Sequence, residues 1–532
     1  MSESKSKRPA GSKIRFRMAP RPKQAFDFAP DQKWVTGRQK GRLTFVEMRP
    51  RVAATSRSSV ATQAHGSATG LGPSTTTDSR LIVEEQPPVS VTRKYAEGDP
   101  GIASRYRYPP GPLRGLSETY SDSSYLNFQE ACLLRHFIEN LGPLFDTSDM
   151  DRHFTIVVPE RSVLCPVLRY AIYTASAGHL IRLAHCPEGP GRTVSVDGLP
   201  LPNVTPETAI RYHDICISHL LQISKDPKEE FNEDVLAAAT ILRFYELIDA
   251  PVAGPSDAYL NAIQFIVNTQ KNESFYAYQT IVAPPRDSSV HQTPSISLCH
   301  SACLAALRLE IWSTFLHQRS FRLPVSRSND YNLCDLNNGF IHANRIFVWV
   351  ADLLNLCFGG NASTAPQDKL QRWTMLKAVA QKLHEQRPPP LSPIYYRERD
   401  PATGRFFPEI WYTNACQVVA AQHVELGRIL LAVSDPTRIS RLGIGTISRN
   451  QALSDELQNF TRRVCGLALS NKRCASAMIT AMVAIAVCGE YFTDPGEQDA
   501  LLNLLRTLEY DYAWPTESTV AALRAAWAAR RP

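Results

Sequence analysis

Hydrophobic residues recur at every third or fourth position over most of the chain after residue 123, which is the spacing of amphipathic helices. The first such stripe covers residues 126–141, and Gly142 followed by Pro143 is expected to end that helix. Further helices are predicted over residues 166–183, 205–223, 235–248, 297–315, 340–358, 369–386, 411–433, 453–469, 475–488 and 494–509, with a last one after Trp514. The alternating pattern of strands is nearly absent, and the one extended piece expected in this region is residues 153–158.

Residues 1–120 have a different composition, rich in Ser, Thr, Pro, Gly and Arg, and such a segment cannot bury a core. We therefore predict a long disordered arm over residues 1–120 and an all-α, irregular multi-helix bundle over residues 121–530. One island interrupts the arm at residues 26–47, where two Phe, a Trp and a strand-like Leu-Thr-Phe-Val sequence occur together. This island is predicted to dock onto another surface.

Charge separates the same two parts. The chain carries a formal charge of +7, yet residues 1–51 hold 14 Lys or Arg against 4 acidic residues, so the remainder is slightly acidic. Eight basic residues near the N-terminus form the concentrated run: Lys5, Lys7, Arg8, Lys13, Arg15, Arg17, Arg21 and Lys23. Such a run favours an import receptor or phosphate groups as its partner, and a merely solvated tail is the alternative.

The N-terminus lacks the continuous apolar stretch of a secretory signal. The longest run of small apolar residues, 475–488, is shorter than the about 20 residues that a bilayer requires, so no membrane partner is expected. The 12 cysteines lie mostly among apolar residues of predicted helices, which is typical of reduced, buried thiols. These features indicate a soluble nuclear or cytosolic protein.

Two groups of residues could offer ligands to a metal ion. His213, Cys216 and His219 lie three apart on one predicted helix, but the two histidines are then separated by about 9 Å, which is far for one zinc ion. Cys299 and Cys303 form a pair with no second pair nearby. We interpret both groups as ordinary helix positions and predict no metal site.

Enzymatic signatures are also missing. The glycines at Gly443 and Gly445 follow no strand and precede no lysine at the spacing of a phosphate loop. Neither Gly-x-Ser-x-Gly nor His-Glu-x-x-His occurs. We therefore predict no catalytic residue and no cofactor, and a helical small-molecule-binding protein or an enzyme with an unrecognised pocket remains the alternative reading.

Several blocks of sequence resemble a known family. They are residues 130–180, residues 212–251, residues 411–442, the Cys-Gly-Leu-Ala-Leu-Ser-Asn motif that begins at Cys465, Cys488-Gly489, residues 497–505 and Trp514-Pro515-Thr516. Together they resemble fungal transcription regulators in which a binuclear zinc cluster precedes the second type of fungal-specific transcription factor domain. Among these, the chain is most similar to regulators of arginine metabolism, and residues 26–47 resemble the segment that follows the zinc cluster.

The resemblance implies a helical regulatory domain over residues 121–530, residence in the nucleus, and other transcription factors or co-regulators as partners. A metabolite effector and a homo- or heterodimer are further partners that it implies. The family's zinc cluster begins Cys-x2-Cys-x6-Cys, whereas the first cysteine here is Cys132, so no zinc ligand carries over. We therefore expect DNA to be bound weakly or indirectly. Either an upstream exon is lost or the protein is naturally cluster-free, and the island favours the first.

Overall fold

The computed structural model describes residues 126–184, 193–225, 233–249, 257–269, 297–324, 338–359, 366–385, 389–438 and 446–530. These ranges all fall within one structural unit. The predicted arm and its island, residues 1–120 and 26–47, lie outside the described residues, as does the Gly443–Gly445 segment.

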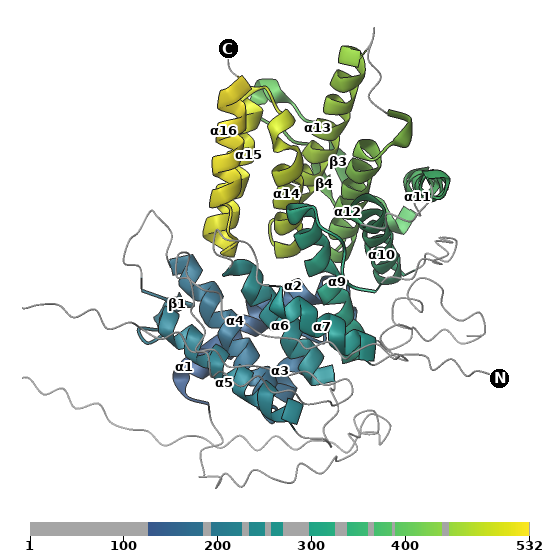
Figure 1. Cartoon of the computed structure of the whole chain (residues 1–532). Helices are drawn as coiled ribbons and strands as arrows, with labels where there is room; N and C mark the ends of the chain where they lie inside the picture. Colours follow the sequence, from purple (N-terminus) through teal and green to yellow (C-terminus); the bar gives the residue numbers. More distant parts are fainter. Residues whose placement is uncertain are drawn as a thin grey trace, which may run out of the picture. The chain divides into compact units, whose positions relative to one another are not determined.

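The first half of this unit contains short helices followed by longer ones (Figure 1). Its helices are α1 (Phe128–His136), the π-helix η1 (Phe137–Leu141), α2 (Gly142–Phe145), the 3-10 turn η2 (Asp146–Ser148), α3 (Val157–Ser162), α4 (Pro166–Ala184), α5 (Pro206–Lys225), α6 (Glu233–Ile248), α7 (Ala258–Thr269) and α9 (Leu298–His317). Two short strands, β1 (Ser195–Val196) and β2 (Leu199–Pro200), pair antiparallel between α4 and α5.

The second half continues with long helices and a second hairpin. Its helices are α10 (Gly339–Phe358), α11 (Pro366–Glu385), η3 (Pro389–Leu391), η4 (Pro401–Thr403), α12 (Ala415–Val433), η5 (Pro436–Arg438), α13 (Thr446–Ser470), α14 (Ala475–Cys488), η6 (Gly489–Tyr491), α15 (Pro495–Tyr512) and α16 (Glu517–Arg530). Strands β3 (Tyr395–Arg397) and β4 (Glu409–Trp411) pair antiparallel. The all-α fold class is confirmed, since these two hairpins are its only strands among the described residues.

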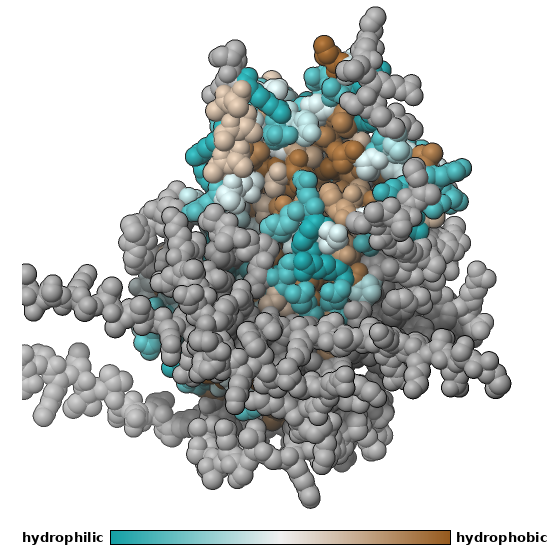
Figure 2. Space-filling view, viewed as in Figure 1, coloured by the Kyte–Doolittle hydropathy of each residue, from teal (hydrophilic) through white to brown (hydrophobic). Residues whose placement is uncertain are grey.

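Apolar helices make up the core of this unit. α4 packs against α5 and α6, α6 packs against α7 and α9, and α9 also contacts α10 and α14. α6 and α14 are apolar nearly all round, and most of their residues are buried, as expected for central helices. On the face drawn in Figure 2, hydrophobic residues gather where Figure 1 places α13, α14 and the β3–β4 hairpin.

Helix α12 is long and apolar enough to cross a membrane. However, most of it is buried inside the protein, where α12 packs against α10, α13 and α14. A core helix passes the same test of length and composition, and the burial identifies α12 as a helix of this kind.

The prediction that Gly142 and Pro143 end the first helix is wrong. The helix widens into the π-turn η1, in which the Gly142 N–H donates to the Phe137 carbonyl, and then runs on to Phe145. A side chain at position 142 would lie 3.1 Å from the Phe154 carbonyl oxygen, so glycine is needed here for close backbone packing rather than for termination. The π-turn also accommodates the missing N–H of Pro143.

The extended piece expected at residues 153–158 is also wrong, because this segment forms a turn that leads into α3. The carboxylate of Asp146 accepts hydrogen bonds from the backbone N–H of Phe154 (2.8 Å) and Thr155 (2.7 Å). A side chain therefore satisfies the backbone donors that a strand would have paired with another strand. This partner could not be recognised from the local alternation of residues.

Candidate functional site

The eight basic residues predicted for nuclear targeting or phosphate contact, Lys5 to Lys23, lie outside the described residues. Their role therefore stays a prediction. The other sequence candidates, His213, Cys216 and His219 of α5 and Cys299 and Cys303 of α9, fall on described helices.

The three residues His213, Cys216 and His219 on α5 do not converge on one point. The His213 Nε2 atom hydrogen-bonds the Tyr259 hydroxyl, and the buried Cys216 thiol donates to the Val167 carbonyl at 3.4 Å. The ring of His219 stacks on Tyr170 with 5.8 Å between centroids. Each side chain is thus directed to a different partner, and the three do not form a metal site.

One group of potential ligands does gather within 4.8 Å among the described residues: Asp149, Asp151 and His153. The Asp149 carboxylate already accepts from the backbone N–H of Asp151 and His153, from His153 Nδ1 at 2.8 Å, and from the Ser301 hydroxyl. Burial raises the pKa of Asp149, but the hydrogen bonds from His153 and Ser301 outweigh it and hold the pKa below its ordinary value. These contacts make the group a closed hydrogen-bonded turn.

The thiols of this unit are structural rather than nucleophilic. The described cysteines form no disulfide, and Cys299 and Cys303 are both buried in α9. Burial raises the pKa of Cys416 and of Cys488 to about 12, and that of Cys465 still higher. A nucleophilic cysteine requires the thiolate, so these protonated thiols lack the property that such chemistry needs.

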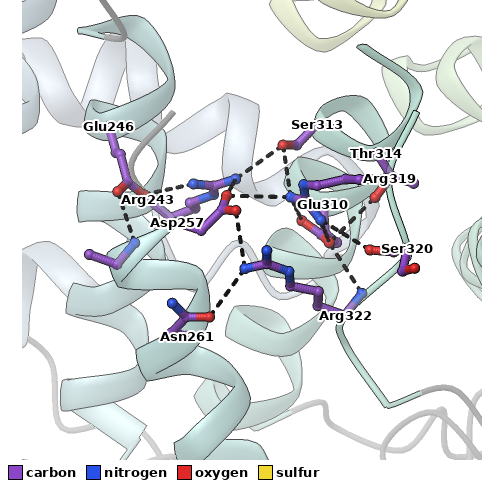
Figure 3. Close-up of polar contacts among 11 residues, drawn as sticks. Arg243, Glu246, Asp257, Asn261, Glu310, Ser313, Thr314, Arg319, Ser320 and Arg322 are labelled. Atoms are coloured by element: carbon purple, nitrogen blue, oxygen red, sulfur yellow. Dashed lines mark hydrogen bonds and ion pairs between the residues drawn. The ribbon is translucent and has the colours of Figure 1, made fainter. Parts of the chain in front are cut away.

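A charged cluster joins α6, α7, α9 and the segment that follows α9 (Figure 3). Its members come from distant positions along the chain: Arg243, Glu246, Asp257, Asn261, Glu310, Ser313, Thr314, Arg319, Ser320 and Arg322. We call this set the arginine clamp. It contains three arginines and three carboxylates, and every one of the six takes part in an ion pair.

Two residues anchor the clamp in the interior. Arg243 is 1% exposed and donates to Glu246 at 2.7 Å, Asp257 at 3.3 Å and the Ser313 hydroxyl at 3.1 Å. Glu310 is 0% exposed, and its two oxygens accept from the two terminal nitrogens of Arg319 at 2.6 and 2.9 Å. Because the charges compensate one another inside the protein, the clamp fixes three helices together and leaves no charge for a ligand.

A second polar centre surrounds Arg308 of α9, which is 2% exposed. Its terminal nitrogens donate to the Ser148 hydroxyl at 2.7 Å and to the carbonyls of Leu144 and Phe145 at 2.9 and 2.6 Å. Asn344 of α10 donates to the Ser148 carbonyl at 3.3 Å. Burial lowers the pKa of Arg308 to about 10, which still leaves the guanidinium charged at neutral pH. The centre thus fastens the η2 turn between α9 and α10.

A small hollow that opens to solvent lies between α10, α11 and α12. Its wall is mostly apolar, with Ile346, Leu383 and Val424, and three polar side chains border it: His342, Tyr412 and Gln417. The Gln417 amide is already bonded to the Pro390 carbonyl and to the Thr413 hydroxyl. The hollow therefore suits an apolar group, and none of these residues was selected by the sequence analysis.

Sequence reasoning also missed the two charged centres, although one signal for them was present. Arg243, Arg308 and Glu310 stand at inward positions of helices that are otherwise apolar on nearly every side. A charge in such a place is almost always paired. Its partner, however, could not be assigned before the helices were packed.

Comparison with known proteins gives a consistent result. The profile of the fungal specific transcription factor domain matches residues 132–532. The chain is 22% identical over 498 residues to the transcription activator AMTR1 of Alternaria alternata, and the alignment covers 76% of this chain. The chain spans 64% of that relative's length. No solved structure matches.

Proposed function

From the premise that the chain belongs to the fungal-specific transcription factor domain family, we propose that it regulates transcription. The observation that carries the proposal is the extent of the family match, because residues 132–532 coincide with the helical body from α1 to α16. The helical body is then the regulatory and interaction module, acting through other transcription factors or co-regulators.

The chemistry of the described residues supports a binding protein rather than an enzyme. Charges in the arginine clamp compensate one another, and the most buried thiols are protonated. Burial lowers the pKa of His179 and of His423 to about 3, so both imidazoles are neutral. Catalysis needs a poised acid, base or nucleophile, and these groups are instead engaged in holding the fold together.

The proposal is tested by fusing the full chain to a heterologous DNA-binding module and measuring transcription of a reporter with sites for that module. We expect reporter output to change about fivefold or more relative to the module alone. A coupling free energy of about 1 kcal/mol between the fused chain and the transcription machinery is enough for a change of this size. Two variants serve as controls. Ala477→Asp, which puts a charge at a 0% exposed position, should abolish the change, while the exposed Glu456→Gln should retain it. Equal output from the fusion and the module alone would contradict the proposal.

We also propose that the chain acts in the nucleus and that Lys5 to Lys23 direct it there, since their positive charge is concentrated in a short segment. Replacing the eight basic residues with Gln should abolish nuclear accumulation of a fluorescently tagged chain. The same change should leave the circular dichroism of the helical body unaltered. Unchanged accumulation would assign targeting to another segment.

We propose that Lys5 to Lys23 contact DNA weakly and independently of sequence, because contacts to phosphates carry no sequence information. Binding of purified protein to two unrelated duplexes should be equal and should fall steeply with salt, each neutralised phosphate adding about −0.9 to the log-log slope. Metal analysis should find no stoichiometric zinc. Contacts to phosphates alone would give the two duplexes equal affinity. A preference of about a hundredfold for one duplex at physiological salt would therefore overturn this proposal.

A further inference from the structure

The β3–β4 hairpin has one covered edge and one open edge. On the covered side, the Ile410 N–H of β4 donates to the Ser470 hydroxyl at 3.0 Å, and its carbonyl accepts from the Asn471 amide at 3.0 Å. The end of α13 therefore occupies the outer edge of β4.

The opposite edge belongs to β3. Tyr396 lies directly across from Ile410. In an antiparallel pair, two residues that face each other direct their backbone groups the same way, either both toward the partner strand or both outward. Because those of Ile410 point outward to α13, the N–H and carbonyl of Tyr396 point outward from β3. Among the described residues, none hydrogen-bonds these two groups.

Exposed hydrophobic side chains lie on both faces of the hairpin beside this open edge, Tyr395 and Trp411 on one face and Ile394 and Tyr396 on the other. Ile394 is 63% exposed, Tyr396 44%, Trp411 43% and Tyr395 39%. The rings of Tyr395 and Trp411 lie 4.8 Å apart, centroid to centroid. An open strand edge bordered by aromatic side chains is a template for an added strand.

The hollow between α10, α11 and α12 adjoins the base of the same hairpin, because Leu391 precedes β3 and Tyr412 directly follows β4. Its apolar wall can receive an apolar side chain. The surface therefore offers backbone hydrogen bonds along β3 and an apolar recess beside them.

We propose that Leu43–Val46 of the same chain docks here as a third strand alongside β3. Thr44, Phe45 and Val46 are good strand formers, and alternation would place Leu43 and Phe45 together on one face. That face packs on Tyr395 and Trp411, whose side chains share one face of the hairpin. This inference is independent of the proposed function in transcription.

The size of the surface favours an occupant from the same chain. A strand edge of three residues buries far less than the about 1,000 Å² that a stable association between separate proteins requires. Residues 48–125, which join the island to α1, are 78 residues long, and the random-coil end-to-end distance for that number of residues is about 50 Å. The resulting effective concentration is on the order of millimolar, so a contact too weak to join two molecules is occupied within one.

A crosslinking experiment on the full chain tests this assignment. Thr44 then lies on the opposite face, which is also the face of Tyr396 and Glu398. In the variant Thr44→Cys with Glu398→Cys, a short bismaleimide should join the two new thiols within the monomer, as identified by peptide mass spectrometry. The matched control is Thr75→Cys with Glu398→Cys. Residue 75 is nearer to α1 along the chain, so crosslinking by random encounter alone would favour the control. We expect about tenfold more crosslink from the Thr44 pair.

Hydrogen exchange provides the second measurement. In the variant Leu43→Asp with Phe45→Asp, amide exchange in the peptide that contains Tyr396 should accelerate about tenfold. Thr75→Asp should leave it unchanged. Leu43, Phe45 and Thr75 lie outside the helical body, so loss of folding does not complicate the exchange result. Equal crosslinking by both pairs, or exchange unaffected by the double substitution, would refute the docking. Crosslinks found only between chains of a dimer would assign the edge to a second copy instead.

Discussion

Glu310 is the residue whose replacement examines the energetics of this fold most directly. Its carboxylate is 0% exposed and receives both terminal nitrogens of Arg319, the Arg322 N–H at 3.2 Å and the Thr314 hydroxyl at 3.3 Å. Glu310→Gln keeps the shape of the side chain but removes its charge. One positive charge of the arginine clamp then loses its strongest partner in a site that water scarcely reaches.

The expected cost follows from burial. Breaking a buried ion pair by removing one partner costs about 3–5 kcal/mol, because the other charge remains desolvated. Unfolding about 400 residues carries an entropy of about 0.85 kcal/mol/K, so the midpoint Tm should fall by about 5 °C. Thermal unfolding followed by circular dichroism measures this shift.

A matched control exists on the surface. Glu456 also accepts two hydrogen bonds from one arginine, Arg438, at 2.8 and 3.0 Å, but its side chain is 42% exposed. Glu456→Gln should therefore cost about 0–1 kcal/mol, or about 1 °C in Tm, and less in high salt. Equal shifts for Glu310→Gln and Glu456→Gln would refute the reasoning, since the two pairs differ chiefly in burial. A loss at Glu310 that disappears in high salt would refute it as well.

Three further predictions concern other buried positions. Burial lowers the pKa of His179 to about 3, far below its value of about 6.5 in the unfolded chain. Below pH 6.5 unfolding therefore takes up a proton, and the stability of the protein should fall as the pH drops from 7 to 5. The variant His179→Gln should show a smaller loss of Tm over this pH range. Burial raises the pKa of the Cys465 thiol well above its usual range, so its alkylation at pH 8 should be about a hundredfold slower in the native chain than in urea, as measured by mass spectrometry. At Gly427 an added Cβ would lie 2.3 Å from the Trp349 ring, so Gly427→Ala should cost about 1–3 kcal/mol in denaturant unfolding.

Local signals in the sequence were enough to locate most helices. The bounds expected for α14, residues 475–488, agree with the structure, and those of α4 and α6 differ from it by one or two residues. Periodicity and capping residues determine these elements within a few turns of chain. The start of α12 is an instructive failure, because the prediction began the helix at Trp411. Trp411 in fact ends β4, and the Asn414 side chain caps the helix by accepting from the Gln417 N–H at 3.0 Å.

Features that depend on two distant segments could not be predicted in this way. The helix α7 was missed, and the hairpin strands β3 and β4 are too short to show an alternating pattern. Gly142 looked like a terminator, yet its role depends on the backbone of Phe154 packed against it. The candidate sites have the same limitation, since the hollow and the open edge of β3 exist only where several helices and the hairpin meet.

By itself the sequence determined the fold class, the position of most helices and the separation of a basic arm from a slightly acidic body, because each depends on the composition or periodicity of contiguous residues. Tertiary structure alone decided which charges are paired. Arg243 and Ser313 are 70 positions apart in the chain, and they meet in the arginine clamp only because α6 packs against α9. Burial then shifts the pKa values of ordinary side chains and makes the loss of one partner of an ion pair costly. Burial itself arises only when the helices pack together.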